Sequence, residues 1–234
     1  KEDSPFRDFA QKILKSAEKA AILIRGLLMF SRKQPSNLEP INLNEIVKEA
    51  ESILVRVIRE DIKLRAVLTD KKCIVMADGN QIEQVLMNLA TNAGDAMPNG
   101  GSLTISTDIM EMDDAFIKAH GYGVKGMYAL ISVSDTGIGM DEITKQKIFE
   151  PFFSTKGAHG TGLGLSVSYS IIERHSGSIS VVSQPGGGTN FTIELPAVAA
   201  ETAAHDPSIE LSDAPSLKIL VIDDEEPVRE TLAE

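Results

Sequence analysis

The chain has 234 residues, a net charge of -11 and an isoelectric point near 4.9. This acidic balance argues against nonspecific binding to nucleic acid or to anionic membranes. Hydrophobic residues make up 42% and charged residues 24% of the sequence, as in ordinary soluble globular proteins. No apolar run reaches the length of a membrane span, and the single cysteine, Cys73, fits a buried thiol in a reducing compartment. We therefore expect a cytoplasmic location. The sequence begins without a methionine, and we expect it to be part of a longer protein. That longer protein can carry a membrane anchor in another segment.

Residues 6–33 predict one long amphipathic helix, because apolar side chains recur along them at helical spacing. Ser4 and Pro5 fit the start of this helix, and Pro35 ends it. A helix of this length is expected to pack its apolar stripe on another helix or on another subunit. The alternative is an ordinary core helix of the same domain.

Short elements follow this helix. Asn42 and the residues after it predict the start of a second helix. Residues 62–68 and 73–77 predict two strands, which we expect to pair with each other through the polar turn between them. Residues 102–107 predict another strand, and residues 108–125 an irregular polar segment.

Residues 78–97 predict a helix with Asp78 as its N-cap. Gln84, Asn88 and Asn92 recur every four residues and form one row at the border of its apolar face. Amide oxygens in such a row can bind Mg²⁺ and orient phosphates, since Mg²⁺ prefers hard oxygen ligands. The alternative is that these side chains cap a neighbouring loop.

Residues 127–134 predict a strand whose apolar row continues into Asp135, which suggests a hydrogen-bond acceptor at the mouth of a pocket. Glycine turns at 135–139 and 160–164 follow, and the second leads into a predicted helix at 165–175. Backbone N–H groups at such a helix start suit a phosphate. Each turn alone could be an ordinary tight turn, and neither is a Walker A loop, because no GK[ST] follows. Strands are predicted at 178–183 and 190–195.

Four blocks taken together resemble the catalytic, ATP-binding domain of bacterial sensor histidine kinases, within the gyrase/Hsp90/histidine kinase/MutL superfamily. NLATNA at 88–93 is similar to the N box, DTGIG at 135–139 to the G1 box, FEPFF at 149–153 to the F box, and GTGLGL at 160–165 to the G2 box. The resemblance spans about residues 40–197. Four ordered boxes are far more specific than any one of them.

The resemblance implies an α/β fold, a two-layer sandwich of the Bergerat type with a mixed sheet, helices on one face, and ATP bound under a lid at 140–160. It assigns Asp135 to the adenine amino group, where guanine would present a second acceptor and be repelled. It assigns Asn92 to Mg²⁺ and Asn88 to the phosphates, with Lys156 as their charge partner, and these three are the expected catalytic residues. The full set expected at the nucleotide is Asn88, Asn92, Asp95, Asp135, Gly137, Ile138, Gly139, Phe152, Lys156, Gly160, Thr161, Gly162, Leu163, Gly164, Leu165 and Thr189.

Two further expectations concern the lid. Phe152 and Phe153 are expected to act as apolar latches there. His159 is open to two interpretations, a phosphate contact or a solvent-exposed side chain.

One position separates the branches of the superfamily. The relatives that hydrolyse ATP place a glutamate, as the base that activates water, four residues before the metal-binding asparagine. That position is Asn88 in this chain, and an amide cannot act as a base. The resemblance therefore implies a site that holds ATP and Mg²⁺ for phosphotransfer to an external acceptor, with little hydrolysis.

The resemblance also divides the chain. Residues 1–36 resemble the second helix of a dimerisation and phosphoacceptor hairpin, 37–197 the catalytic domain, 198–215 a linker, and 216–234 the start of a receiver domain. The implied partners are ATP, the missing phosphoacceptor helix, the receiver domain and a cognate response regulator, in a hybrid kinase that is a homodimer; no nucleic acid is expected. The chain's four histidines, His120, His159, His175 and His205, lie outside any phosphoacceptor motif, so we do not expect this chain to phosphorylate itself.

Two other function classes remain open. A non-catalytic nucleotide-binding or dimerisation scaffold is disfavoured by the intact Asn88, Asn92 and Asp135. An ATPase clamp of the MutL or Hsp90 type is disfavoured by Asn88 and the F box.

Overall fold

The computed structural model describes residues 37–114, 125–156 and 160–198. The predicted helix at 6–33, the linker beyond residue 198 and the receiver-like residues 216–234 lie outside the described residues. The described elements, in chain order, are β1 (Glu39–Asn42), α2 (Leu43–Val57), β2 (Ile62–Val67), β3 (Ile74–Ala77), α3 (Gly79–Ala96), β4 (Gly101–Met112), β5 (Gly126–Asp135), α5 (Glu142–Lys147), α6 (Gly164–Arg174), β6 (Ser178–Ser183) and β7 (Thr189–Pro196).

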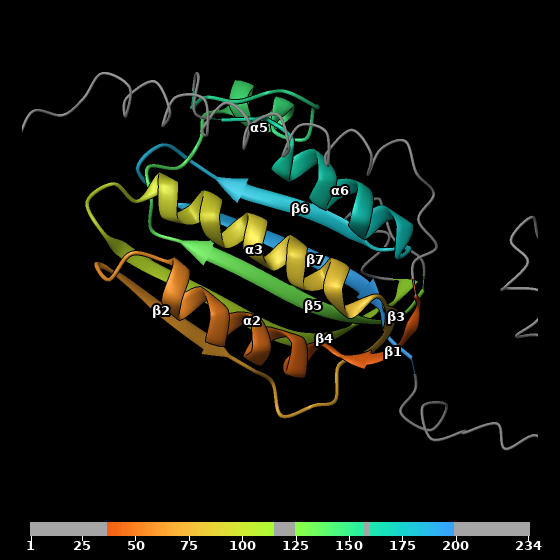
Figure 1. The fold of residues 1–234 in the computed structure, drawn as a ribbon. Coiled ribbons are helices and arrows are strands. Elements are labelled where there is room, and N and C mark those ends of the chain that lie inside the picture. The colour runs from red at the N-terminus through yellow and green to blue at the C-terminus, as the bar shows by residue number, and fades with distance from the viewer. Residues whose placement is uncertain (1–36, 115–124, 157–159, 199–234) are drawn as a thin grey trace, which may run out of the picture. The chain divides into compact units, whose positions relative to one another are not determined.

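A five-stranded mixed sheet forms one layer, in the order β2-β4-β5-β7-β6. The β2–β4 pair is parallel, and the other neighbouring strands are antiparallel. Helices α2, α3 and α6 lie on the same face of this sheet (Figure 1). This confirms the predicted two-layer α/β sandwich with a mixed sheet and helices on one face.

The core lies between that sheet face and the helices. Along β5, Ala129, Ile131 and Val133 are 0–2% exposed, and Asp135 is 8% exposed. Strand alternation puts all four on one face, as the sequence predicts. The row that packs the core therefore also carries a carboxylate to the end of the strand.

Capping side chains fix where the helices begin and end. Asn42 and Asp78 are the N-caps of α2 and α3, and each accepts a hydrogen bond from a backbone N–H of the first turn. His175, predicted as the last residue of its helix, is the C-cap of α6 and is 5% exposed. Its Nδ1 donates to Ile171 O at 2.7 Å, and its Nε2 accepts from Asp78 N–H at 3.0 Å. The ring therefore joins the end of α6 to the start of α3.

Two strand predictions are wrong. β2 and β3 do not pair with each other, because β2 pairs with β4 and β3 pairs with β1, a strand that the sequence does not indicate. Residues 108–112, expected to be irregular, continue β4, where they pair with β5 as far as Gly126. In both cases the pairing depends on a partner strand that is distant in the sequence.

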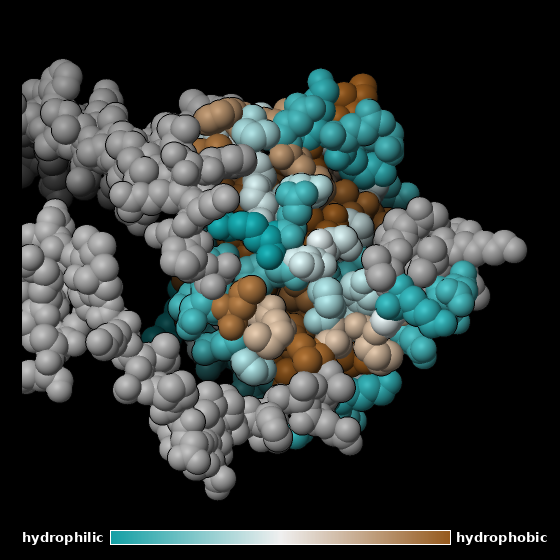
Figure 2. All heavy atoms as spheres, turned by 90° about the vertical axis from the view of Figure 1, so that its right-hand side faces the viewer, coloured by the Kyte–Doolittle hydropathy of each residue, from teal (hydrophilic) through white to brown (hydrophobic). Residues whose placement is uncertain are grey.

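The surface mixes polar and apolar side chains. At the end of the molecule where β1 and β3 lie, hydrophobic groups come to the surface among hydrophilic ones (Figure 2). Within the described ranges, none of the helices combines the length and the apolar character that crossing a bilayer requires.

Candidate functional site

A cavity of about 480 Å³ lies between α3, the first glycine turn, α5 and the start of α6. It is lined by Asn88, Thr91, Asn92, Ala93, Asp95, Ala96, Asp135, Ile138, Gly139, Met140, Thr144, Ile148, Phe153, Ser154, Thr155, Lys156, Gly160, Thr161, Gly162, Gly164, Leu165, Thr189 and Phe191. Segments from the N, G1, F and G2 blocks thus meet around one space. Of the predicted nucleotide contacts, Gly137, Phe152 and Leu163 do not line it.

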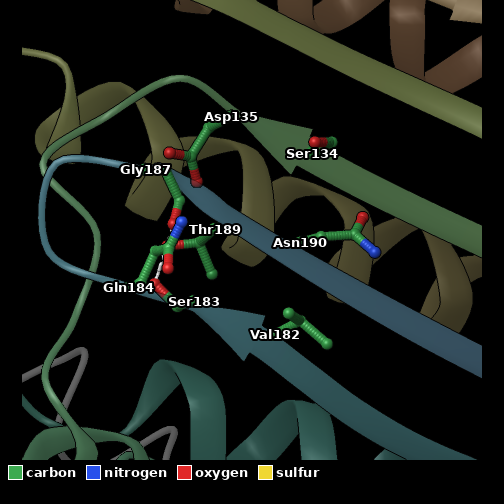
Figure 3. A pocket seen from close by; sticks show the side chains of 9 residues that line it. Ser134, Asp135, Val182, Ser183, Gln184, Gly187, Thr189 and Asn190 are labelled. Carbon is green, nitrogen blue, oxygen red and sulfur yellow. Dashed lines mark hydrogen bonds between the residues drawn. The ribbon is translucent and has the colours of Figure 1, made fainter.

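Asp135 forms a buried hydrogen-bond acceptor at one end of the cavity. Its Oδ1 accepts from Gly137 N–H at 2.8 Å, which orients the carboxylate. Burial raises the pKa of the Asp135 carboxyl above its ordinary value, and the N–H groups of Gly137 and Thr189 offset part of this rise. The side chain lies beside Gly187 in the β6–β7 turn and Thr189 at the start of β7 (Figure 3), where a second hollow of about 280 Å³ opens.

The first glycine turn is held from two sides. Ile138 N–H donates to Ala96 O at the end of α3, at 2.9 Å, and Ile138 O accepts from Gly186 N–H at 2.7 Å. Gly139 has φ +66°, and a Cβ at this residue would overlap Gln184 O in the β6–β7 turn. The turn can therefore approach its neighbours this closely only with glycine there.

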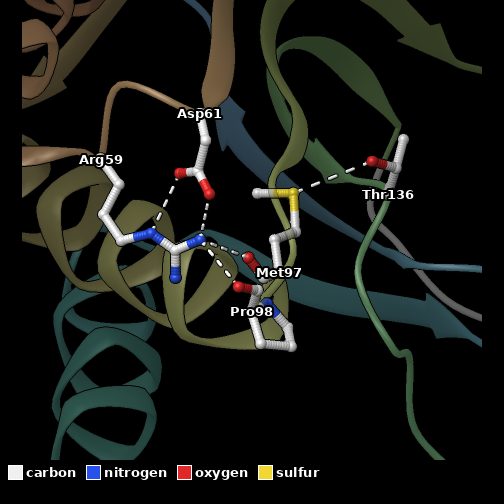
Figure 4. A network of polar contacts seen from close by, with 5 residues as sticks. All are labelled: Arg59, Asp61, Met97, Pro98 and Thr136. Carbon is white, nitrogen blue, oxygen red and sulfur yellow. Dashed lines mark hydrogen bonds and ion pairs between the residues drawn. The ribbon is translucent and has the colours of Figure 1, made fainter.

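A polar network fixes the C-terminal end of α3 beside this turn. Arg59 pairs with Asp61 and donates to Met97 O at 3.1 Å and to Pro98 O at 3.0 Å (Figure 4). The ion pair holds the pKa of the Asp61 carboxyl below its usual range. Met97 Sδ in turn accepts from the Thr136 hydroxyl at 3.8 Å. Arg59 was not predicted as part of the site, because the two carbonyls to which it donates lie 38 and 39 residues away.

The other end of the cavity carries the amide row of α3. Asn92 Oδ1 accepts from Lys156 Nζ at 2.8 Å, and Asp95 Oδ2 accepts from the same Nζ at 2.6 Å. Asn88 Nδ2 donates to Gly164 O and to Ser168 Oγ, both at 3.4 Å. Gln84, the third member of the predicted row, is not among the lining residues.

The second glycine turn brings the start of α6 to this end. Leu163 is the N-cap of α6 and makes no side-chain capping hydrogen bond, while Gly164 and Leu165 line the cavity. Backbone N–H groups in the first turn of a helix favour an anion. Phe152 N–H donates to Gly162 O at 2.9 Å, and a Cβ at Gly162 would overlap the backbone of Phe152.

The structure separates the two predicted latch residues. Phe153 lines the cavity and packs against the core. Phe152, with φ +68°, is 61% exposed and does not line the cavity. The left-handed backbone of Phe152 accounts for the difference between these two neighbouring side chains. His159 lies outside the described residues.

The oxygen atoms on α3 suit a hard cation. Asn92 Oδ1 and Asp95 Oδ2 already hold one positive charge, the Lys156 ammonium. Amide and carboxylate oxygens are ligands that Mg²⁺ accepts, together with waters and substrate phosphates. In the described part of the chain, no three His, Cys, Asp or Glu residues gather as a metal cluster. A Mg²⁺ ion here would therefore take most of its ligands from a bound triphosphate and from water.

Comparison with known proteins agrees with this geometry. Residues 77–199 match the family described as histidine kinase-, DNA gyrase B- and HSP90-like ATPases. The chain belongs to this family. Two relatives are named as kinases. The sensor kinase CckA of Brucella abortus is 38% identical over 238 residues, covering 97% of this chain and 25% of that protein. AtoS, a signal transduction histidine-protein kinase of Escherichia coli, is 33% identical, covering 83% of this chain and 30% of that protein.

Solved structures place the described part among histidine kinase catalytic domains. The catalytic domain of histidine kinase ThkA is 32% identical, with a TM-score of 0.56, covering 69% of this chain and 96% of that one. ThkA in complex with the response regulator protein TrrA gives a TM-score of 0.64 at 27% identity, covering 84% of this chain and 53% of that one. The chain therefore contains the ATP-binding catalytic domain of a sensor histidine kinase. It spans a quarter of CckA and under a third of AtoS.

Several lining residues were missed by the sequence analysis. They are Thr91, Ala93, Ala96, Met140, Thr144, Ile148, Ser154, Thr155 and Phe191. Phe191 could have been found, because it follows Thr189 by two residues on the same face of β7. Thr144 and Ile148 could not have been found in this way, because α5 has only six residues, too few to show a helical pattern.

Proposed function

We propose that this domain binds ATP with the adenine at Asp135 and the triphosphate, with Mg²⁺, between Asn88, Asn92 and the start of α6. It then donates the γ-phosphate to a histidine on a phosphoacceptor helix outside the chain. One observation carries the proposal: a single cavity joins a buried carboxylate at one end to amide oxygens and an uncapped helix start at the other. A carboxylate accepts from the adenine amino group, and helix N–H groups donate to phosphate oxygens.

The remaining residues of the site then have defined roles. Asn92 Oδ1 would bind Mg²⁺, which would neutralise charge on the phosphates. Asn88 cannot take a proton from water, so the site favours transfer over hydrolysis. His175, the histidine within the described residues, is not the acceptor, because it is 5% exposed and both ring nitrogens are hydrogen-bonded.

The proposed relay ends on a receiver aspartate. ThkA, which resembles this chain in fold and sequence, has been solved in complex with a response regulator. A response regulator is therefore the proposed downstream partner, and residues 216–234 are the proposed start of a receiver domain in a hybrid, homodimeric parent.

The test is phosphotransfer in trans. The chain would be incubated with Mg²⁺, ATP labelled on the γ-phosphate and a hairpin that carries the parent's acceptor histidine, beside an Asn92→Ala control. Label on the hairpin that is lost in acid and kept in base, and absent with the control, supports the proposal. Free phosphate without labelled hairpin would instead indicate an ATPase, and ATP binding without either product a scaffold.

A further inference from the structure

Lys156 is held at the phosphate end of the cavity by two residues of α3. Its Nζ lies 2.8 Å from Asn92 Oδ1 and 2.6 Å from Asp95 Oδ2. The side chain of Lys156 is 36% exposed and that of Asp95 is 62% exposed. An ion pair this accessible to water is weak and readily exchanged.

The position of this ammonium conflicts with the proposed binding of Mg²⁺. Asn92 Oδ1, the oxygen proposed to bind the metal, already accepts from Lys156. A second positive charge close to an ammonium is repelled. Lys156 must therefore move when Mg²⁺ and a triphosphate bind.

The triphosphate itself offers Lys156 a new partner. Among the residues that line the described cavity, Lys156 is the one cation, whereas Asp95 and Asp135 are the anions. Asp135 lies at the opposite, adenine end. Asp95 and the incoming phosphates therefore compete for the same ammonium.

We propose that Asp95 is a positioning residue that holds Lys156 beside Asn92, and that nucleotide binding is an exchange of Lys156 from Asp95 to the phosphates. This inference rests on the proposed function, since it uses the same ATP site. Asp95 then weakens ATP binding, although it lines the site. The effect depends on the phosphates, because an adenosine without phosphates cannot draw Lys156 away.

The first test compares the affinity of wild type and Asp95→Asn for Mg²⁺-ATP and for adenosine by calorimetry. Removing a competing exposed carboxylate should tighten Mg²⁺-ATP binding by about two- to fivefold, the range of an exposed ion pair, and leave adenosine binding unchanged. Glu142→Gln is the matched control, because Glu142 is also exposed and paired, with Lys145 at 2.7 Å, but does not line the cavity. Its affinities should equal those of the wild type.

Equal or weaker Mg²⁺-ATP binding by Asp95→Asn would overturn the proposal. Equal binding would mean that Asp95 has no effect on the nucleotide, and weaker binding that it contacts the waters on the metal. If the wild type binds no ATP at all, the proposed function itself fails. The two failures are therefore distinguishable.

A second variant tests whether the exchange runs through the lysine. Lys156→Met should weaken Mg²⁺-ATP binding, and in that background Asp95→Asn should no longer tighten it. An equal gain from Asp95→Asn with and without Lys156 would show direct repulsion between Asp95 and phosphate, and would overturn the exchange.

Discussion

Gly139→Ala tests the contact that holds the first glycine turn against the β6–β7 turn. Gly139 has φ +66°, where a side chain costs about 1–2 kcal/mol. A Cβ there would also overlap Gln184 O, a backbone atom that cannot swing aside. Overpacking of this kind costs a further ~1–3 kcal/mol. We therefore expect a loss of about 2–5 kcal/mol in the free energy of unfolding.

Gly186→Ala is the matched control for this prediction. Gly186 has φ +75°, but a Cβ there meets nothing within 4 Å. Only the conformational cost of about 1–2 kcal/mol should appear. Urea unfolding followed by circular dichroism measures both losses.

ATP binding should separate the two variants further. Gly139→Ala must shift the turn that carries Ile138 at the cavity wall, so its affinity for ATP should fall at least about tenfold, a cost of ~1.4 kcal/mol. Gly186→Ala should keep wild-type affinity. Equal losses of stability and affinity in the two variants would refute the proposed contact between the turns.

The buried carboxylate Asp135, the Arg59 network and the core face of β5 can each be tested by substitution. Because burial raises the folded pKa of Asp135, its contribution to stability is present below the ordinary aspartate pKa and lost as the pH rises through the folded value. Asp135→Asn should therefore gain stability relative to wild type in urea titrations as the pH rises above about 4, the ordinary aspartate pKa, and a relative loss would contradict this. Arg59→Met should lower the midpoint of urea unfolding, since two carbonyls at the end of α3 lose their donor, and an unchanged midpoint would argue against the network. Ile131→Ala, at 0% exposure, should cost ~2–5 kcal/mol, whereas Val182→Ala, at 72% exposure, should change stability by less than about 0.5 kcal/mol; similar losses in thermal melts would oppose the assigned core face.

Local sequence patterns were sufficient for the parts of the fold that depend on neighbouring residues. Alternation along residues 127–134 predicted the buried face of β5 and the position of Asp135. The N-caps Asn42 and Asp78 were predicted because each side chain acts within its own first turn. The four-residue spacing of Gln84, Asn88 and Asn92 predicted one row of amides, of which Asn88 and Asn92 line the cavity and Gln84 does not.

Long-range partners could not be predicted from such patterns. A polar turn between two apolar runs resembles a hairpin, but β2 and β3 each pair with a different strand. The ion pair between Lys156 and Asp95 joins residues 61 positions apart. The side chain of Phe152 is exposed because its backbone is left-handed, and the hydrogen bond from Phe152 N–H to Gly162 O holds that backbone.

Calorimetric binding of ATP and GTP, with Mg²⁺, to the wild type and to Asp135→Asn tests whether Asp135 reads the adenine. We expect that ATP binds, that GTP does not, and that the variant loses most of the ATP affinity while it stays folded. GTP binding as tight as ATP, or undiminished ATP binding by Asp135→Asn, would contradict the adenine-reading role of this carboxylate.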